Sequence, residues 1–377
     1  MTRYTDFINY NLRMLTDQAR MNAYRRALIS TVQPNDVVLD LGCGSGILSF
    51  FACQAGARMV YAIEAEPVIE LAKQVSRHNR LDDRITFLNA HSFRVSLPER
   101  VDVIVTETMG AFGMDEGMVG SLIDARTRFL RQGGTVIPQR ITFFLVPVEM
   151  PGFYEHMVQF WMDGSHGVDF SPIRQLAANH FHPIKFHETA YLSEPSPIAD
   201  ADLQKVLRSD IDVHRRFTAT RAGVCHGLCG WFVAQLTPAI RLSNGPADQD
   251  AHWGSAFFPL QRPVRIQPGT PIEVTMQSSG NGSLWSWCVT INRDRFAHAT
   301  PITFTMLPAD ERRLLPDASP TLSPQGRAEL FALSMLNGQT AIADVQAELC
   351  KNFPELLISA EQAAVFLQEI LVRAAYV

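Results

Sequence analysis

The chain has 377 residues, of which 46% are hydrophobic and 19% are charged, and its net charge at neutral pH is -5. This length accommodates two or three domains with separate cores. The acidic balance argues against a nucleic-acid surface, the longest apolar runs are too short to span a membrane, and the N-terminus lacks a secretion-signal pattern, so we expect a cytoplasmic protein without nucleic-acid or membrane partners.

The first part of the chain alternates helices and strands. Apolar residues recur at helical spacing from Leu12 to Ile29, and Pro34 follows this predicted helix. Short buried strands are predicted at 37–40, 59–63, 85–88 and 101–106, and helices at 47–55, 67–79 and 118–131. This alternation predicts the fold class α/β, with a doubly wound parallel sheet, for residues 1–139.

Strands dominate residues 140–305. They are predicted at 141–148, 230–236, 253–258, 271–276 and 284–291. Glycine, proline and asparagine separate them, which is typical of an antiparallel β-barrel. A polar and partly helical insertion, roughly 150–208, interrupts this second domain.

Six cysteines are scattered along the chain, as expected for reduced thiols and not for a disulfide framework. Cys225 and Cys229 have the spacing of half a metal site, but no second pair completes four ligands. They also run into the strand-like segment 230–234. We therefore expect buried thiols on a strand and no bound metal.

The last part of the chain changes character again. Residues 306–324 form a predicted proline-rich linker, and residues 325–377 form a small helical unit. Its three amphipathic helices are predicted at 327–336, 341–352 and 360–373. Thr340 is the predicted N-cap of the second helix.

A cofactor site is predicted between the first strand and the next helix. Asp40 is followed there by Gly42, Gly44 and Gly46, and residues without a Cβ atom let the backbone approach a ligand closely. Glu64 ends the second strand, where a carboxylate can accept both hydroxyls of a ribose. Together these residues predict an adenosine-containing ligand.

Two features favour S-adenosylmethionine over a dinucleotide. The spacing D-x-G-x-G-x-G differs from the G-x-G-x-x-G that binds a pyrophosphate. Arg20, on the helix before the first strand, can pair with a carboxylate, which the methionine moiety has and NAD lacks. A solvated helix face is the alternative explanation for Arg20.

Two carboxylates, Glu107 and Glu116, lie nine positions apart on a glycine-rich segment after the fourth strand. We call residues 107–116 the glutamate loop. A loop that folds back on itself brings both carboxylates to one cation, and the planar N–H donors of a guanidinium accept two acidic partners at once. The alternative is two solvated carboxylates, which the neighbouring cofactor motif disfavours.

With these motifs, the chain resembles the protein arginine methyltransferase family over about residues 11–305. The segment M-L-T-D-Q-A-R-M-N-A-Y at 14–24 is similar to that family's first cofactor-covering helix. Glu107 and Glu116 match its paired-glutamate loop. The sequence A-H-W at 251–253 is similar to its Thr-His-Trp loop, with one residue altered.

The resemblance implies a role for each matching residue. The residues it assigns to S-adenosyl-L-methionine are Arg20, Asp40, Gly42, Gly44, Gly46 and Glu64. Those it assigns to catalysis are Glu107, Glu116, His252 and Asp17, and those it assigns to the substrate are Met14, Met118 and Trp253. It implies that Glu64 holds the ribose, that Arg20 holds the methionine carboxylate, and that a His252–Asp17 pair ties the barrel to the first helix.

Some residues depart from the family pattern. Thr108, Ala111 and Asp115 stand where the family has aromatic residues in the glutamate loop, which predicts a wider and more acidic pocket. Phe93 stands near the position from which an acidic residue meets the adenine amino group.

Two further resemblances concern partners. The insertion at about 168–195 is similar to the arm through which the family dimerises, which implies a homodimer. Residues 322–373 resemble the helical part of PqqD-type domains, which recruit the leader of a ribosomally made precursor peptide to its modifying enzyme. A helical cap on the barrel or on a dimer is the alternative for this last unit.

The predicted function is therefore an S-adenosylmethionine-dependent arginine N-methyltransferase acting on a peptide or protein. One alternative is an enzyme of the same fold that methylates another amine or a small molecule. The other is an inactive scaffold homologue. The presence of Arg20, Glu64 and both glutamates argues against a scaffold.

Overall fold

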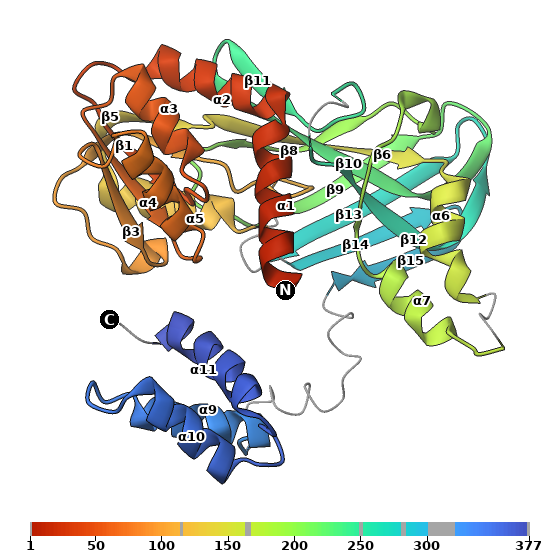
Figure 1. The fold of residues 1–377 in the computed structure, drawn as a ribbon. Coiled ribbons are helices and arrows are strands. Elements are labelled where there is room, and N and C mark those ends of the chain that lie inside the picture. The colour runs from red at the N-terminus through yellow and green to blue at the C-terminus, as the bar shows by residue number, and fades with distance from the viewer. Residues whose placement is uncertain are drawn as a thin grey trace. The chain divides into compact units, whose positions relative to one another are not determined.

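The computed structural model describes residues 2–113, 116–162, 167–248, 252–279, 284–300 and 321–374. The chain divides into two compact units, Met1–Met306 and Leu307–Val377, whose elements Figure 1 labels. Within the described residues, every helix is too short or too polar to span a bilayer.

A five-stranded parallel sheet forms the first part of unit 1. In spatial order its strands are β3 (Ile85–Asn89), β2 (Met59–Glu64), β1 (Val37–Leu41), β4 (Val101–Thr106) and β5 (Leu130–Ile137). The central strand β1 is buried throughout and pairs with β2 on one side and β4 on the other. The predicted α/β fold is confirmed, and β5 is an additional strand. Because the chain order reverses beside β1, the carboxyl ends of β1, β2 and β4 border the crevice in which such folds bind ligands.

Helix α2 (Gln18–Thr31) precedes the first of these strands. The helices that connect them are α3 (Ile47–Ala55), α4 (Ile69–His78), the short 3-10 turn η1 (Ser92–Arg94) and α5 (Met118–Phe129). α3 is bounded by Gly46 and Gly56, both in the left-handed conformation that glycine adopts without a Cβ penalty. These glycines therefore set both ends of the helix that follows the cofactor motif.

The single helix predicted from Leu12 to Ile29 is in fact two. α1 (Thr2–Thr16) ends just before Asp17, whose carboxylate accepts a 2.9 Å hydrogen bond from the backbone N–H of Arg20 and caps α2. Apolar residues continue at helical spacing across this break, so the sequence pattern does not reveal the cap at Asp17. In Figure 1, α1 (red) runs between the parallel sheet and the antiparallel sheets.

Two antiparallel sheets form the second part of unit 1. The first has the order β7-β12-β10-β6-β8, with β11 paired to β10: β6 (Arg140–Val148), β7 (His182–Ile184), β8 (Ser196–Asp202), β10 (Gly223–Thr237), β11 (Ile240–Ser243) and β12 (Ser255–Ile266). The second has the order β15-β14-β13-β9: β9 (Asp212–Thr218), β13 (Pro271–Ser279), β14 (Leu284–Ile291) and β15 (Asp294–Ala299). The sheets share a core, in which the rings of Phe258 and Trp287 lie 5.3 Å apart. Trp253, predicted to begin a strand, lies in the loop before β12.

The two cysteines of the half metal motif lie on β10. Cys225 and Cys229 are both fully buried, which confirms the prediction of buried thiols on a strand. Among the residues that the structure describes, no three histidine, cysteine or acidic side chains gather as metal ligands.

The insertion between β6 and β8, which we call the arm (residues 149–195), is largely helical. It contains α6 (Pro151–Met157), η2 (Gln159–Met162), α7 (Ser171–Ala178) and η3 (Glu188–Ala190). These helices fall within the partly helical insertion predicted at roughly 150–208, and proline at the first turn of α6 is compatible with a helix start.

Unit 2 is a three-helix cluster. It consists of α9 (Pro324–Met335), α10 (Ile342–Asn352) and α11 (Ala360–Ala374), packed around Val345, Leu349 and Leu367. The predicted N-cap at Thr340 is wrong: Ala341 occupies that position, and the backbone N–H and hydroxyl of Thr340 both bond to the side chain of Asn337. The part of the predicted linker at 306–320 lies outside the described residues.

Candidate active site

The glycine loop, residues 42–46, leaves the carboxyl end of β1. Gly42, Gly44 and Gly46 have φ angles of 76°, 52° and 84°, which residues with a Cβ atom rarely adopt. A Cβ on Gly42 would lie 2.7 Å from the methyl group of Thr108, whereas one on Gly44 would meet nothing within 4 Å. Gly42 thus permits close packing against the glutamate loop, and Gly44 borders space that a ligand can fill.

Glu64 turns its carboxylate towards the glycine loop from the end of β2. Gly44 N–H donates a 3.0 Å hydrogen bond to Oε2, and Glu66 N–H donates a 2.9 Å bond to Oε1. Two backbone donors therefore hold this carboxylate in place, with remaining lone pairs available for hydroxyl groups.

Asp40 lies behind the glycine loop. It is fully buried, and the hydroxyl of Ser49 on α3 donates a 2.6 Å hydrogen bond to its Oδ2. Burial raises the pKa of Asp40 to about 7, against the opposing effect of that bond. Asp40 joins β1 to α3 beneath the loop and does not reach the surface.

The glutamate loop is anchored at its midpoint. Phe112 is fully buried in the core of the antiparallel sheets, with ring centroids 5.0 Å from Trp285 and 5.2 Å from Phe258. A turn closed by the 3.1 Å bond from Gly113 N–H to Gly110 O reverses the chain there. The two glutamates therefore stand on either side of a fixed apex. Met114 and the predicted departure Asp115 lie outside the described residues.

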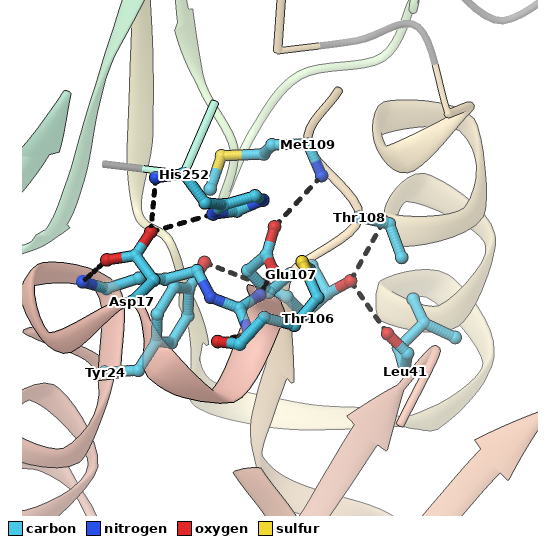
Figure 2. A network of polar contacts seen from close by, with 10 residues as sticks. Asp17, Tyr24, Leu41, Thr106, Glu107, Thr108, Met109 and His252 are labelled. Atoms are coloured by element: carbon cyan, nitrogen blue, oxygen red, sulfur yellow. Dashed lines mark hydrogen bonds and ion pairs between the residues drawn. The ribbon is translucent and has the colours of Figure 1, made fainter. Parts of the chain in front are cut away.

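Glu107 already contacts a guanidinium, that of Arg20. Its side chain is 4% exposed, and its Oε2 contacts Nη1 of Arg20. Arg20 also donates a 3.0 Å bond from Nη2 to Met14 O, and its buried Nε has no hydrogen-bond partner among the described residues. Figure 2 shows Glu107 within a polar network that includes Thr106, Thr108 and Met109. The Glu107 carboxylate is thus placed in a buried site that accommodates a guanidinium.

Glu116, in contrast, is exposed at the far end of the loop. Desolvation and the negative charge of Glu116 raise the pKa of Tyr10 on α1, and Glu116 also interacts electrostatically with Arg20. The structure therefore brings both glutamates and Arg20 into one electrostatic neighbourhood beneath α1.

Asp17 and His252 are joined directly, as Figure 2 shows. Asp17 Oδ2 accepts hydrogen bonds of 2.7 Å from the backbone N–H and 2.8 Å from Nδ1 of His252. Desolvation alone would raise the pKa of Asp17, but bonds from His252 and Arg20 outweigh it and lower the pKa. Desolvation also lowers the pKa of His252. At neutral pH both directions favour an ionised carboxylate beside a neutral imidazole, and the pair connects α2 to the loop before β12.

Trp253 completes this side of the site. It is buried against Phe232, at a ring distance of 5.5 Å, and the guanidinium carbon of Arg20 lies 5.9 Å from the centre of its ring.

Met118 is fully buried at the start of α5, whereas Met14 is partly exposed on α1. Ala251, the altered residue of the His-Trp loop, lies outside the described residues.

Phe93 is half-exposed on η1 and stacks on His91 at a centroid distance of 5.1 Å. Its ring therefore has a free face near the end of β3. No carboxylate takes its place in η1, whose sequence is Ser-Phe-Arg.

Two residues that sequence analysis missed tie the site together. The hydroxyl of Tyr24 donates a 3.0 Å bond to the carbonyl of Thr106, the residue before Glu107. The Thr106 hydroxyl donates a 2.8 Å bond to Leu41 O, at the end of β1. Thr106 thus connects the starts of the glutamate and glycine loops. Tyr24 could have been found from the sequence, because it lies one helical turn after Arg20 on the same helix.

These residues fit an adenosine linked to an amino acid. The fixed carboxylate of Glu64 suits ribose hydroxyls, and the open space at Gly44 admits the ligand beside the backbone. Arg20 offers a buried guanidinium with an unpartnered Nε to a carboxylate.

The sequence is similar to known families over most of unit 1. Residues 139–284 match the arginine methyltransferase oligomerization subdomain, and residues 23–139 match ribosomal protein L11 methyltransferase. Protein arginine N-methyltransferase 1 of Schizosaccharomyces pombe is 32% identical over 271 residues, covering 70% of this chain and 79% of the relative. Protein arginine N-methyltransferase 6 of Xenopus tropicalis is 33% identical over 296 residues, covering 73% of this chain and 85% of the relative.

Solved structures share the fold. The Trypanosoma brucei PRMT1 enzyme–prozyme heterotetrameric complex with AdoHcy aligns with a TM-score of 0.70 and 23% identity, covering 77% of this chain and 96% of that one. Protein arginine methyltransferase 10 of Arabidopsis thaliana aligns with a TM-score of 0.67 and 24% identity, covering 78% and 99%.

Proposed function

This chain belongs to the protein arginine N-methyltransferase family, as an enzyme that uses S-adenosyl-L-methionine, and we propose that Glu107 and Glu116 hold the arginine side chain that it methylates. One observation carries the assignment of these residues: the buried carboxylate of Glu107 already contacts a guanidinium, that of Arg20. An arginine side chain from a substrate presents the same planar group.

The cofactor supplies an electrophilic methyl group on its sulfonium when it is bound. In the proposed arrangement Glu64 binds the ribose hydroxyls and Arg20 binds the methionine carboxylate. Arg20 contacts Met14 on α1 as well as Glu107, which supports a place for it between the proposed cofactor and substrate positions.

The two glutamates then act on the substrate in two ways. They localise the positive charge of the guanidinium on the nitrogens that they contact, which leaves electron density on the remaining nitrogen for attack. They also orient that nitrogen, and the burial of Glu107 keeps water from it. After transfer, one glutamate of the pair can accept the proton that leaves.

Glu107→Gln tests the proposal. The amide keeps the size of the side chain and removes its charge, so we expect methyl transfer to fall by at least about a hundredfold, as for loss of a major electrostatic contact in a transition state. Binding of S-adenosylhomocysteine should stay within a few-fold. The measurements are transfer of a radiolabelled methyl group to an arginine peptide and calorimetry of cofactor binding.

Glu273→Gln, an exposed glutamate on β13, is the matched control and should keep full transfer. Undiminished transfer by Glu107→Gln would rule out the guanidinium assignment. Transfer to small amines at the same rate as to an arginine peptide would indicate a different acceptor.

We further propose that unit 2 binds the substrate polypeptide, as a leader-binding unit does for a ribosomally made precursor. Residues 322–377 contain six acidic and three basic side chains, so this segment is acidic. Unit 2 also has exposed apolar side chains, including Leu330 on α9 and Val365 on α11. A basic, partly apolar peptide that carries arginine is complementary to such a surface.

We also propose that the enzyme is a homodimer formed through the arm. A groove of about 610 Å³ lies among its helices and is lined mostly by apolar side chains such as Trp161, Ile173 and Leu176. Phe160, which also lines the groove, and Met162 lie on η2 and are 49% and 48% exposed. Exposed apolar residues beside an apolar groove are typical of a surface that another protein covers.

A further inference from the structure

Asn244, in the loop after β11, makes hydrogen bonds with both its side-chain oxygen and its side-chain nitrogen. The residue is 3% exposed. Its Oδ1 accepts a 2.9 Å hydrogen bond from Phe232 N–H on β10. Its Nδ2 donates one bond of 2.7 Å to Ala111 O and another of 2.9 Å to Gly254 O. If the amide were rotated by 180°, its NH2 group would face the N–H of Phe232 and its oxygen would face the two carbonyl oxygens. These three partners therefore determine its orientation.

The two carbonyl groups belong to the two loops that border the site. Ala111 lies at the middle of the glutamate loop, beside the buried Phe112. Gly254 directly follows the His252–Trp253 pair, whose histidine is bonded to Asp17. One side chain thus joins the loop that carries both glutamates to the loop that contacts α2.

We propose that Asn244 is a positioning residue that sets the spacing between the glutamate loop and the His252–Trp253 loop, and thereby the fit of the substrate guanidinium. The inference rests on the proposed function of the two glutamates. It adds a residue that touches neither the cofactor motif nor either glutamate.

Asparagine meets these demands where aspartate and serine do not. Aspartate would place a carboxylate oxygen against two carbonyl oxygens, and serine has a single O–H donor for two acceptors. The backbone of Asn244 is held as well, because its carbonyl accepts a 2.8 Å bond from the Ser255 hydroxyl. The amide therefore cannot shift to compensate for the movement of either loop.

The glutamate loop has a second anchor that is independent of Asn244. Phe112 remains packed between Trp285 and Phe258 whatever residue stands at 244. Loss of the amide is therefore expected to loosen the spacing between the loops without releasing the loop from the core. The expected defect lies in arginine binding and alignment, not in the cofactor site.

Asn244→Ala and Asn244→Asp test this inference in the full-length protein. We expect KM for an arginine peptide to rise by about tenfold, the equivalent of one lost hydrogen bond of ordinary strength. Asn244→Ser keeps one donor and should show a smaller rise. The Kd of S-adenosylhomocysteine should change by less than about twofold, because Gly44, Glu64 and Arg20 keep their contacts.

Ser278→Ala is the control for general destabilisation. Ser278 is also buried, and its hydroxyl oxygen accepts a 2.8 Å bond from Ile211 N–H in the other antiparallel sheet. It should lower the melting temperature and leave KM unchanged. If Asn244→Ala, Asp and Ser only lower the melting temperature and keep the KM of the natural protein, Asn244 is purely structural and the inference is wrong.

This failure is distinguishable from failure of the proposed function. If Glu107→Gln retains full transfer, the guanidinium assignment itself fails. If Glu107→Gln is inactive while all Asn244 variants keep their KM, only the positioning role fails.

Discussion

Asp40 places a carboxyl group where no water reaches it. Its pKa, raised by burial to about 7, lies above the ordinary value of about 3.9 for an exposed aspartate. Between these two values the folded protein binds a proton that the unfolded chain releases. The contribution of Asp40 to the free energy of unfolding therefore falls as the pH rises from about 4 to 7.

Asp40→Asn removes this titration while keeping the shape of the side chain. We expect the melting temperature of the variant, relative to that of the natural protein, to rise between pH 5 and pH 8. Thermal unfolding followed at a series of pH values measures the difference. Asp82→Asn, on an exposed turn, should show no such trend. A constant difference for Asp40→Asn at all pH values would contradict the assigned burial effect.

At the scale of elements, the break at Asp17 gives one side chain two functions. One carboxylate oxygen caps α2, and the other accepts both hydrogen bonds from His252. In a continuous helix, the backbone N–H of Arg20 would be bonded to a backbone carbonyl of the same helix. The Asp17 carboxylate would then have no free N–H group to cap. The break therefore lets α1 leave the direction of α2 while Arg20, one turn into α2, stays beside Glu107.

The arm is a second element with a testable role. Phe160→Asp puts a charge on the exposed apolar surface of η2, and burying an unpaired charge in an interface costs several kcal/mol. We expect the variant to be monomeric at concentrations where the natural protein is a dimer, as measured by sedimentation velocity.

Leu207→Asp provides the matched control, because Leu207 is 81% exposed in the segment between β8 and β9, outside the arm. It should leave the dimer intact. A monomeric natural protein, or a Phe160→Asp variant that dimerises equally well, would exclude the proposed interface.

At the scale of the whole molecule, the proposed function assigns a different task to each of the two compact units. All residues that fit the cofactor lie in unit 1, so a chain that ends at residue 321 should bind S-adenosylhomocysteine like the full-length protein. Its affinity for a fluorescent arginine-rich peptide should fall by at least about fivefold, because the acidic helices are lost. Fluorescence anisotropy measures the loss of affinity for the peptide, and repeating it at low and high salt tests whether the lost binding is electrostatic.

Charge reversal refines this test without deletion. Glu355→Lys and Glu361→Lys on unit 2 should weaken peptide binding, whereas Glu273→Lys on β13 should not. Equal affinity of the truncated and full-length chains for the peptide would show that unit 2 does not recruit substrate.

Local rules made much of the cofactor site predictable. Strand, glycine turn and helix follow one another within a short segment, and Gly42, Gly44 and Gly46 need positive φ angles that other residues avoid. Glu64 ends the strand adjacent to β1, and the carboxyl ends of neighbouring parallel strands meet at one edge of a sheet. Sequence and chain direction therefore place these groups together without knowledge of the rest of the fold.

Contacts between distant segments were accessible only in the folded chain. The Asp17–His252 pair was anticipated by family resemblance, since nothing in the spacing of residues 235 positions apart predicts a bond. Asn244 and Thr106 had no signal of their own, because a side-chain bond to a distant carbonyl leaves no periodicity in either partner. Periodicity and glycine spacing predicted most strands and helices of unit 1 and the cofactor motif, but not β5 or the break between α1 and α2. The tertiary structure decided that Glu107 faces Arg20 and that Asn244 joins both loops, because hydrogen bonds depend on distances that only the packed sheets set.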